Sequence, residues 1–284
     1  MQSLKHVAIV SETDQVSFSD VSLASAALQK QVMKDFGPIW NESATVDSFA
    51  KLEDVPVGSW VIMIRDDIGY AGAAGIHLDS EGQPFALVQY SNTWQLTTSH
   101  ELLEMLADPF GNRLQSGDSI KPGQGKVQYL VEVCDPSESF EFGYRVNGIQ
   151  LSDFYTPNYF DPVTASCVRY SFTEAIKNPR EVLKGGYISW YDPASDHWWQ
   201  ATFFGSQIAF RDLGKITAAN GDFRTAIENQ TFVDEKVNGL PAKDKRLKVT
   251  EAPLTAAQNA SSSKAAKLRE HVEELKKQYA VTPA

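Results

Sequence analysis

Apolar and polar positions alternate along the first part of the chain in a way that predicts both strands and helices. Three compact apolar runs predict strands, at residues 6–10, 60–64 and 85–90. Between the first two runs an apolar residue recurs at every fourth position, namely Ala24, Leu28, Val32 and Phe36. This spacing predicts a helix over residues 21–36 with one stripe facing the core. Gly37-Pro38 would end it.

A second helix is predicted over residues 98–108, where Thr98 or Ser99 could cap the start and Pro109 ends the pattern. From about residue 126 to residue 204 the pattern favours strands. The strand candidates are residues 127–134, 144–146, 149–151, 166–172, 187–191 and 198–204. Asn147-Gly148 between two of them is a strong hairpin signal.

These patterns predict an α+β fold with a mixed sheet, a helix that carries the site, and a mostly β second half. The predicted domain covers residues 1–204. Residues 205–263 are more polar and less patterned, so we expect an irregular segment. Residues 264–284 have the composition of a C-terminal helix or tail.

Composition narrows the classes of function. The 284 residues carry a formal net charge of −10, which disfavours non-specific binding to nucleic acid. No apolar run reaches the 18 residues that would suggest a membrane span. The first residues lack the pattern of a secretory signal, so we expect a protein that is cytoplasmic or exported without a recognisable signal peptide. Two cysteines do not make a disulfide framework.

Residues 99–109, SHELLEMLADP, contain the candidate chemistry. On a helix, His100 and Glu104 project from one face and could bind one divalent metal ion. Catalytic zinc commonly has three protein ligands and one open position. The candidates for the third ligand, in order of preference, are Glu132, Asp135, Asp108 and Cys134.

Several segments together resemble a group of bacterial proteins related to zincin metallopeptidases. They are LQKQVMKDFGPIW, AGAAGIHLDSEGQPFALVQ, TTSHELLEMLADPFGNRL, YLVEVCDPSE and LSDFYTPNYF, and they span about half of the chain. In zincins a strand runs along the substrate cleft and a loop leads into a helix with the motif HExxH. The segment from Gly75 to Glu104 is similar to that arrangement.

The resemblance implies a metal-dependent peptidase that acts on peptide or protein substrates. This chain has Glu104 where zincins have a second histidine, and Phe110 where metzincins have a third. A site with one histidine and two carboxylates carries more negative charge than the usual zinc site. Zinc is the expected metal. Mn²⁺ and Ca²⁺, which are harder ions that prefer oxygen ligands, are the alternatives.

The resemblance also suggests roles for three further residues. Glu101 occupies the place of the general base, which accepts a proton from water and returns it to the leaving amine. His77 and Tyr155 are candidate donors to the oxyanion. The alternative is a non-catalytic zincin-fold protein that acts as a binding or interaction module.

Overall fold

A computed structural model describes residues 4–70, 72–80, 82–218 and 221–234. The predicted C-terminal helix at residues 264–284 lies outside the described residues. The helices are α1 (Phe18–Lys30), continued by a π-helical segment (Gln31–Phe36), α2 (Gly37–Trp40), α3 (Trp94–Ala107) and α4 (Phe223–Asp234). Short 3₁₀ turns occur at Leu52–Asp54, Asp135–Ser137, Phe140–Phe142 and Pro157–Phe160. The α+β content is as expected.

The first sheet is mixed and has five strands. In spatial order they are β2 (Ala44–Phe49), β1 (Lys5–Ser11), β3 (Trp60–Arg65), β5 (Gln83–Gln89) and β4 (Gly75–Ser80). The first four are parallel, and β4 pairs antiparallel with β5 at the edge. The three strands predicted from apolar runs are confirmed as β1, β3 and β5.

Helices cover one face of this sheet. Side chains alternate along β1, so that Val7 and Ile9 join the main core together with residues of α1 and α3. Ala8 and Val10 face the opposite side and pack with Val55. Helix α3 packs against β5 and β4, which brings its polar side chains beside the edge strand.

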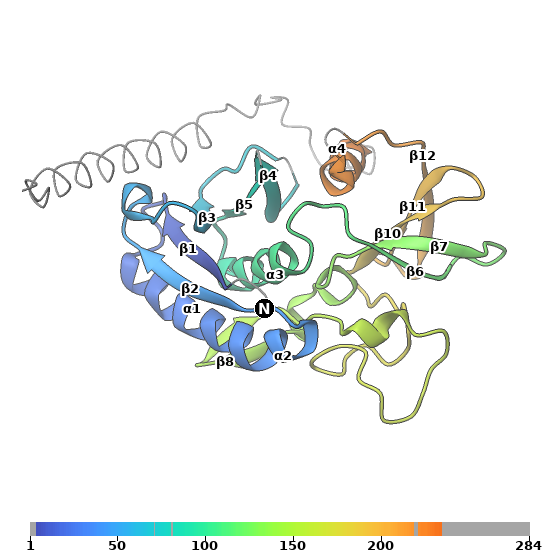
Figure 1. The fold of residues 1–284 in the computed structure, drawn as a ribbon, viewed down its shortest axis with the longest axis horizontal. Helices are drawn as coiled ribbons and strands as arrows, with labels where there is room; N and C mark the ends of the chain where they lie inside the picture. Colours follow the sequence, from blue (N-terminus) through green and yellow to red (C-terminus); the bar gives the residue numbers. More distant parts are fainter. Residues whose placement is uncertain (1–3, 71, 81, 219–220, 235–284) are drawn as a thin grey trace, which may run out of the picture.

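The second sheet is antiparallel and also has five strands. Their order is β12 (Ala209–Gly214), β11 (His197–Thr202), β10 (Tyr187–Asp192), β7 (Lys126–Leu130) and β6 (Leu114–Asp118). A separate hairpin, β8 (Tyr144–Val146) and β9 (Ile149–Leu151), confirms the prediction made from Asn147-Gly148. Figure 1 shows α3 in the middle of the molecule and the second five-stranded sheet on one side of it. Helix α4 lies near both β4 and β12 (Figure 1).

Several predicted details are wrong. The segment expected to be irregular from residue 205 contains β12 and α4, because a few apolar residues, Leu213 and Ile227 among them, pack against Trp198. Residues 166–172 form no strand and make only a single bridge, between Ser171 and Tyr155. Strand β7 ends at Leu130 rather than at residue 134, so the residues that follow belong to a loop.

Candidate metal centre

Helix α3 is fixed in place by buried polar contacts. It begins at Trp94, one turn earlier than predicted, so Thr98 and Ser99 lie inside the helix and do not cap it. Ser99 Oγ instead donates to Oε1 of Gln31 at 2.7 Å and accepts from the amide of Ser152 at 3.0 Å. These bonds join α3 to the π-helical segment and to the chain after β9, which fixes the direction in which His100 and Glu104 project.

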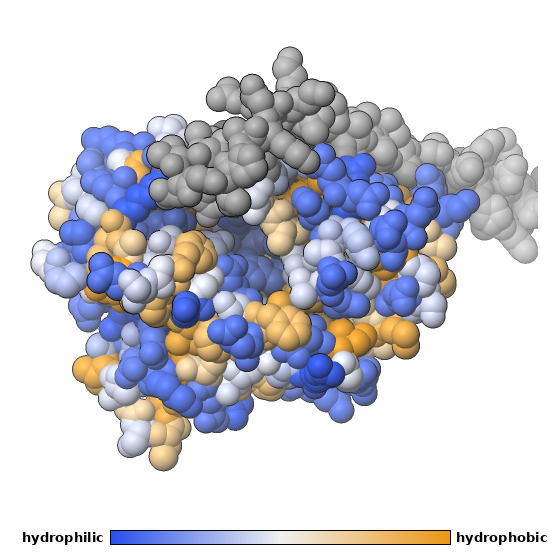
Figure 2. Space-filling view, turned by 180° about the vertical axis from the view of Figure 1, so that it is seen from behind, coloured by the Kyte–Doolittle hydropathy of each residue, from blue (hydrophilic) through white to orange (hydrophobic). Residues whose placement is uncertain are grey.

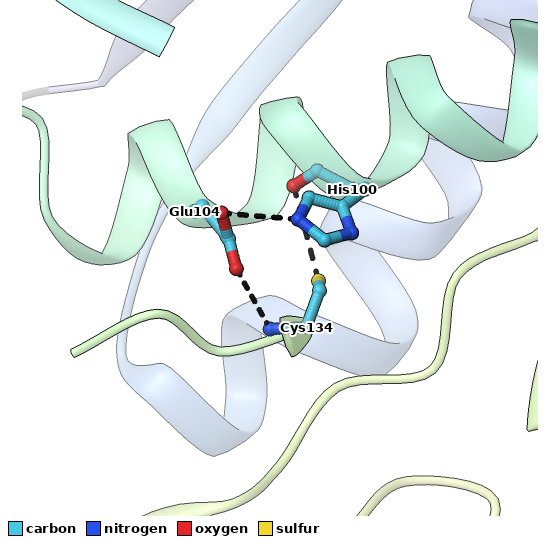
Figure 3. Close-up of side chains that lie close together, drawn as sticks. All are labelled: His100, Glu104 and Cys134. Atoms are coloured by element: carbon cyan, nitrogen blue, oxygen red, sulfur yellow. Dashed lines mark hydrogen bonds and ion pairs between the residues drawn. The ribbon is translucent and has the colours of Figure 1, made fainter. Parts of the chain in front are cut away.

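The two carboxylate oxygens of Glu104 have different partners. Oε1 accepts a hydrogen bond from the amide of Cys134 at 3.0 Å, which ties the loop after β7 to α3. Oε2 lies 3.2 Å from Nε2 of His100, one turn earlier on the same helix. Figure 3 shows both contacts. One oxygen thus anchors the loop while the other points toward the imidazole.

Asp135, from that loop, also lies beside His100. Its Oδ1 lies 3.2 Å from Nε2 of His100, and its side chain is almost fully buried. Two ligands of a tetrahedral ion with bonds of about 2.0–2.1 Å lie roughly 3.3 Å apart. His100 lies at about this separation from each of the two carboxylates, and ligand atoms of Glu104, Glu132 and Asp135 also come within 4.8 Å of one another.

The predicted first choice for the third ligand, Glu132, is held differently. Both of its carboxylate oxygens lie 2.8 Å from Nε of Arg224, which comes from α4. The same guanidinium donates to the carbonyl oxygens of His77 and Asp108, each at 2.9 Å. The charge of Glu132 is therefore balanced by Arg224, and Asp135 takes its place beside His100. Glu132 also belongs to a group with Glu104 and Asp135 whose ligand atoms come within 4.8 Å of one another, so the ranking of Glu132 above Asp135 stays a prediction.

Asp108 and Cys134, the two remaining candidates for the third ligand, have contacts of their own. Asp108 accepts hydrogen bonds from the amides of Asn112 and Arg113, at 3.1 and 2.8 Å, and so shapes the turn after α3. Cys134 Sγ lies 3.8 Å from the backbone oxygen of His100 (Figure 3). Burial raises the pKa of the Cys134 thiol well above its usual value, and Sγ comes within 4.8 Å of ligand atoms of His100 and Glu104.

Glu101 and His77 form a neighbouring pair. His77 Nδ1 lies 3.2 Å from Oε2 of Glu101, and the side chain of His77 is 1% exposed. The other oxygen of Glu101 approaches β4 closely, since a Cβ atom added to Gly75 would lie 2.4 Å from Oε1. Glu101 is therefore confined between a histidine and a strand that has no side chain at the point of contact.

Burial and mutual repulsion perturb the acids of the centre. Burial, together with the charge of Glu104, raises the pKa of Asp135 to about 7. Burial raises the pKa of Glu101 to about 8. Burial opposes the ionisation of Glu104, yet the charge and hydrogen bond of His100 lower its pKa to about 2. Burial alone would lower the pKa of His100, but Glu104 and Asp135 raise it well above its usual value.

Two cavities open at this centre. One, of about 460 Å³, is lined by His100, Glu101 and Glu104 from α3 and by the start of β4. The other, of about 310 Å³, lies between the second sheet and α4 and is lined by Asp135. Figure 2 shows a hollow with hydrophilic walls on one face of the molecule. Tyr187 lines both cavities.

The two predicted oxyanion donors do not reach this space. Tyr155 is 0% exposed and His77 is 1% exposed, and neither lines either cavity. Burial raises the pKa of Tyr155 well above its usual value, so the phenol keeps its proton. Tyr187 is the tyrosine that lines both cavities, and its hydroxyl forms a hydrogen bond with the side chain of Asp135.

Sequence reasoning missed Arg224, Tyr187 and Glu228 as residues of this centre. Arg224 and Glu228 come from α4, within the segment expected to be irregular. Arg224 binds the backbone of His77 although 147 positions separate them. A buried arginine in an amphipathic stretch has no local signal that distinguishes it from a surface residue. Glu138 also lines the first cavity, and the sequence indicated only an acidic patch there.

No family model, curated protein or solved structure matches the chain. Among the described residues, none of the helices has the length and apolar character needed to span a bilayer.

Proposed function

We propose that the chain is a metal-dependent hydrolase of peptide bonds, in which His100, Glu104 and Asp135 hold a divalent ion. The observation that carries the proposal is the position of Nε2 of His100, 3.2 Å from one oxygen of each carboxylate. The His100 side chain is 15% exposed, against 3% for Glu104 and 2% for Asp135. Of the three residues, His100 is thus the most exposed, and it lines the first cavity, where a substrate could enter.

The donor set fits a divalent ion. One imidazole and two carboxylates are ligands of zinc, and also suit manganese. Asp135 and Glu104 would neutralise the two positive charges, while Glu132 is already neutralised by Arg224. When bound, such an ion would supply Lewis acidity for activating water and a carbonyl group.

Glu101 is the residue best placed to act as the general base. It lines the cavity beside His100 and Glu104. Its pKa of about 8 without a cation is raised by burial, and a nearby positive charge would lower it toward neutral pH. His77 contacts Glu101 and not the cavity, so we assign it as a positioning residue. Tyr187 replaces Tyr155 as the proposed donor to the oxyanion.

The topology supports a zincin-like arrangement. The antiparallel edge strand β4 leads through β5 into α3, and α1 and α3 join the core on one face of the sheet. In zincin peptidases the strand along the cleft and the helix with the motif have this relation. In this chain α3 packs against the edge strand β4, and β5 lies between the two in the sequence.

Elemental analysis and a cleavage assay test the proposal together. We expect about one divalent ion per chain after zinc or manganese is supplied and free metal is removed. The metal-loaded protein should cleave a mixed library of quenched fluorescent peptides. Glu101→Gln should keep the metal and lose cleavage by at least about 100-fold, because a general base is worth this much.

Three outcomes separate the alternatives. Cleavage that survives Glu101→Gln would show that another group acts as the base. Bound metal without cleavage of any peptide would favour the non-catalytic binding module. Failure to bind any divalent ion would contradict the metal centre itself.

A further inference from the structure

One carboxylate on the wall of the two cavities has an oxygen without a hydrogen-bond partner among the described residues. Glu228 of α4 lines both cavities that open at the candidate metal centre. Its Oε2 is buried and accepts no hydrogen bond from the described residues. A buried anionic oxygen costs free energy unless a donor or a cation meets it. Helix α4 is held firmly by Arg224 and by Ile227 in the core, so Glu228 keeps its place.

Glu228 lies outside the set that could hold the ion. Among the described residues, the potential ligand atoms that come within 4.8 Å of one another belong to other side chains, including Glu138 but not Glu228. Glu228 therefore faces the space beside the ion rather than the ion.

The balance of charge in the first cavity favours a cation. Of the described residues that line it, none is lysine or arginine. A divalent ion would offset Glu104 and Asp135, and the carboxyl groups of Glu228 and Glu138 would still face this cavity, while Arg211 and Arg224 line the second cavity. The first cavity has apolar walls formed by Leu96, Phe140 and Phe204. A long side chain with a charged end could pack its methylene groups against such walls.

We propose that the cleft selects peptides that carry a cationic nitrogen next to the scissile bond, and that Glu228 binds this nitrogen. The inference rests on the proposed function, because it names the substrate class of the same site. The nitrogen could belong to a lysine or arginine side chain or to a free N-terminal ammonium. Both would make a charge-assisted hydrogen bond with a carboxylate in a partly desolvated place.

Hydroxamates are suitable probes, since they bind active-site metal ions and do not require turnover. The metal-loaded full-length protein would be titrated calorimetrically with acetohydroxamic acid, norleucine hydroxamate and arginine hydroxamate. The two amino-acid probes would also be used with the α-amine acetylated. Norleucine and arginine differ mainly in the terminal charge, and the acetylated pair removes the α-ammonium.

We expect a cationic probe to bind roughly tenfold or more tightly than its neutral counterpart. A preference of arginine over norleucine that survives acetylation identifies a side-chain cation. A preference for the free over the acetylated forms identifies the α-ammonium. Glu228→Gln should abolish the preference for the cationic probe. Glu174→Gln, which removes an exposed carboxylate paired with Arg169, should keep the preference.

Two results would overturn the inference, and they differ in what else they overturn. If acetohydroxamic acid binds and no cationic probe is preferred in the unaltered protein, the substrate class is wrong while the metal centre stands. This comparison needs no variant and does not depend on the folding of Glu228→Gln. If acetohydroxamic acid itself does not bind, the metal centre fails, and the substrate class fails with it.

Discussion

His100 and Asp135 meet at 3.2 Å, between Nε2 of the imidazole and Oδ1 of the carboxylate. One residue lies in the middle of α3, and the other begins a 3₁₀ turn after β7. The bond between the amide of Cys134 and Glu104 places this turn, so a single carboxylate both joins the two segments and faces the imidazole. The centre therefore depends on the docking of the β half of the chain onto α3.

This relationship predicts different effects for two carboxylates of the same loop. Asp135→Asn should weaken zinc binding by at least about 100-fold, because it removes a charged ligand, whereas second-sphere changes cost about 10–100-fold. Glu132→Gln should retain most of the affinity, because Glu132 is paired with Arg224. Competition with a chromophoric chelator measures both values. The opposite ranking would restore Glu132 as the third ligand.

The second prediction concerns Gly75, whose lack of a side chain leaves room for Glu101. A methyl group at this position would meet Oε1 of Glu101 at 2.4 Å, so Gly75→Ala should displace the proposed base. We expect peptide cleavage to fall by roughly 10–100-fold, since a displacement of about 1 Å can cost this much.

Metal content should not change in Gly75→Ala. Gly125→Ala is the matched control, because a Cβ atom there meets nothing within 4 Å. Equal activities of the two variants would mean that Glu101 can move without consequence, which a general base should not tolerate.

The sequence predicted those parts of the fold that have a local periodic signal. The apolar runs of β1, β3 and β5 and the hairpin at Asn147-Gly148 are confirmed. Helix α3 was predicted from its apolar residues, but its start was placed too late. Thr98 and Ser99 look like caps in the sequence, whereas here they bond within the core, Ser99 to Gln31.

The centre itself was predictable only in part. His100 and Glu104 follow from helical spacing, and the structure places both at the cavity. The choice between Glu132 and Asp135 depended on where Arg224 lies, and that residue comes from a distant helix. Tyr155 was named as a donor to the oxyanion because it need not be a metal ligand. Its burial against Tyr159, with ring centroids 4.3 Å apart, depends on tertiary packing.

Arg224 should be essential for stability. Its guanidinium is 3% exposed and joins α4 to Glu132 and to the backbones of β4 and the turn after α3. Arg224→Met leaves the buried carboxyl group of Glu132 without its partner, so we expect a loss of about 3–5 kcal/mol in the free energy of unfolding.

Urea denaturation followed by circular dichroism measures this loss. Lys126→Met is the control, because the lysine side chain is 70% exposed in its pair with Asp118. That variant should unfold at nearly the same urea concentration as the unaltered protein. A similar midpoint for Arg224→Met would show that α4 is not fixed by this ion pair.

The final prediction concerns the dependence of stability on pH without metal. The folded-state pKa values of Asp135 and Glu101, about 7 and about 8, exceed the ordinary values of 3.8 and 4.5. The folded protein therefore binds more protons than the unfolded chain, and its stability falls as pH rises through these values. His100, whose pKa is raised, acts in the same direction above 6.5. The lowered pKa of His77 acts oppositely, but only below 6.5.

Between pH 6.5 and about pH 8 all these contributions have one sign. The free energy of unfolding of the chelator-treated protein should decrease across this interval. Zinc must displace the protons of His100 and Asp135, so its affinity, and the stabilisation it gives, should increase over the same interval. Urea denaturation with and without zinc would therefore give two curves that diverge as pH rises. Parallel curves would show that metal binding displaces no protons from these residues, and the ligand assignment would then be wrong.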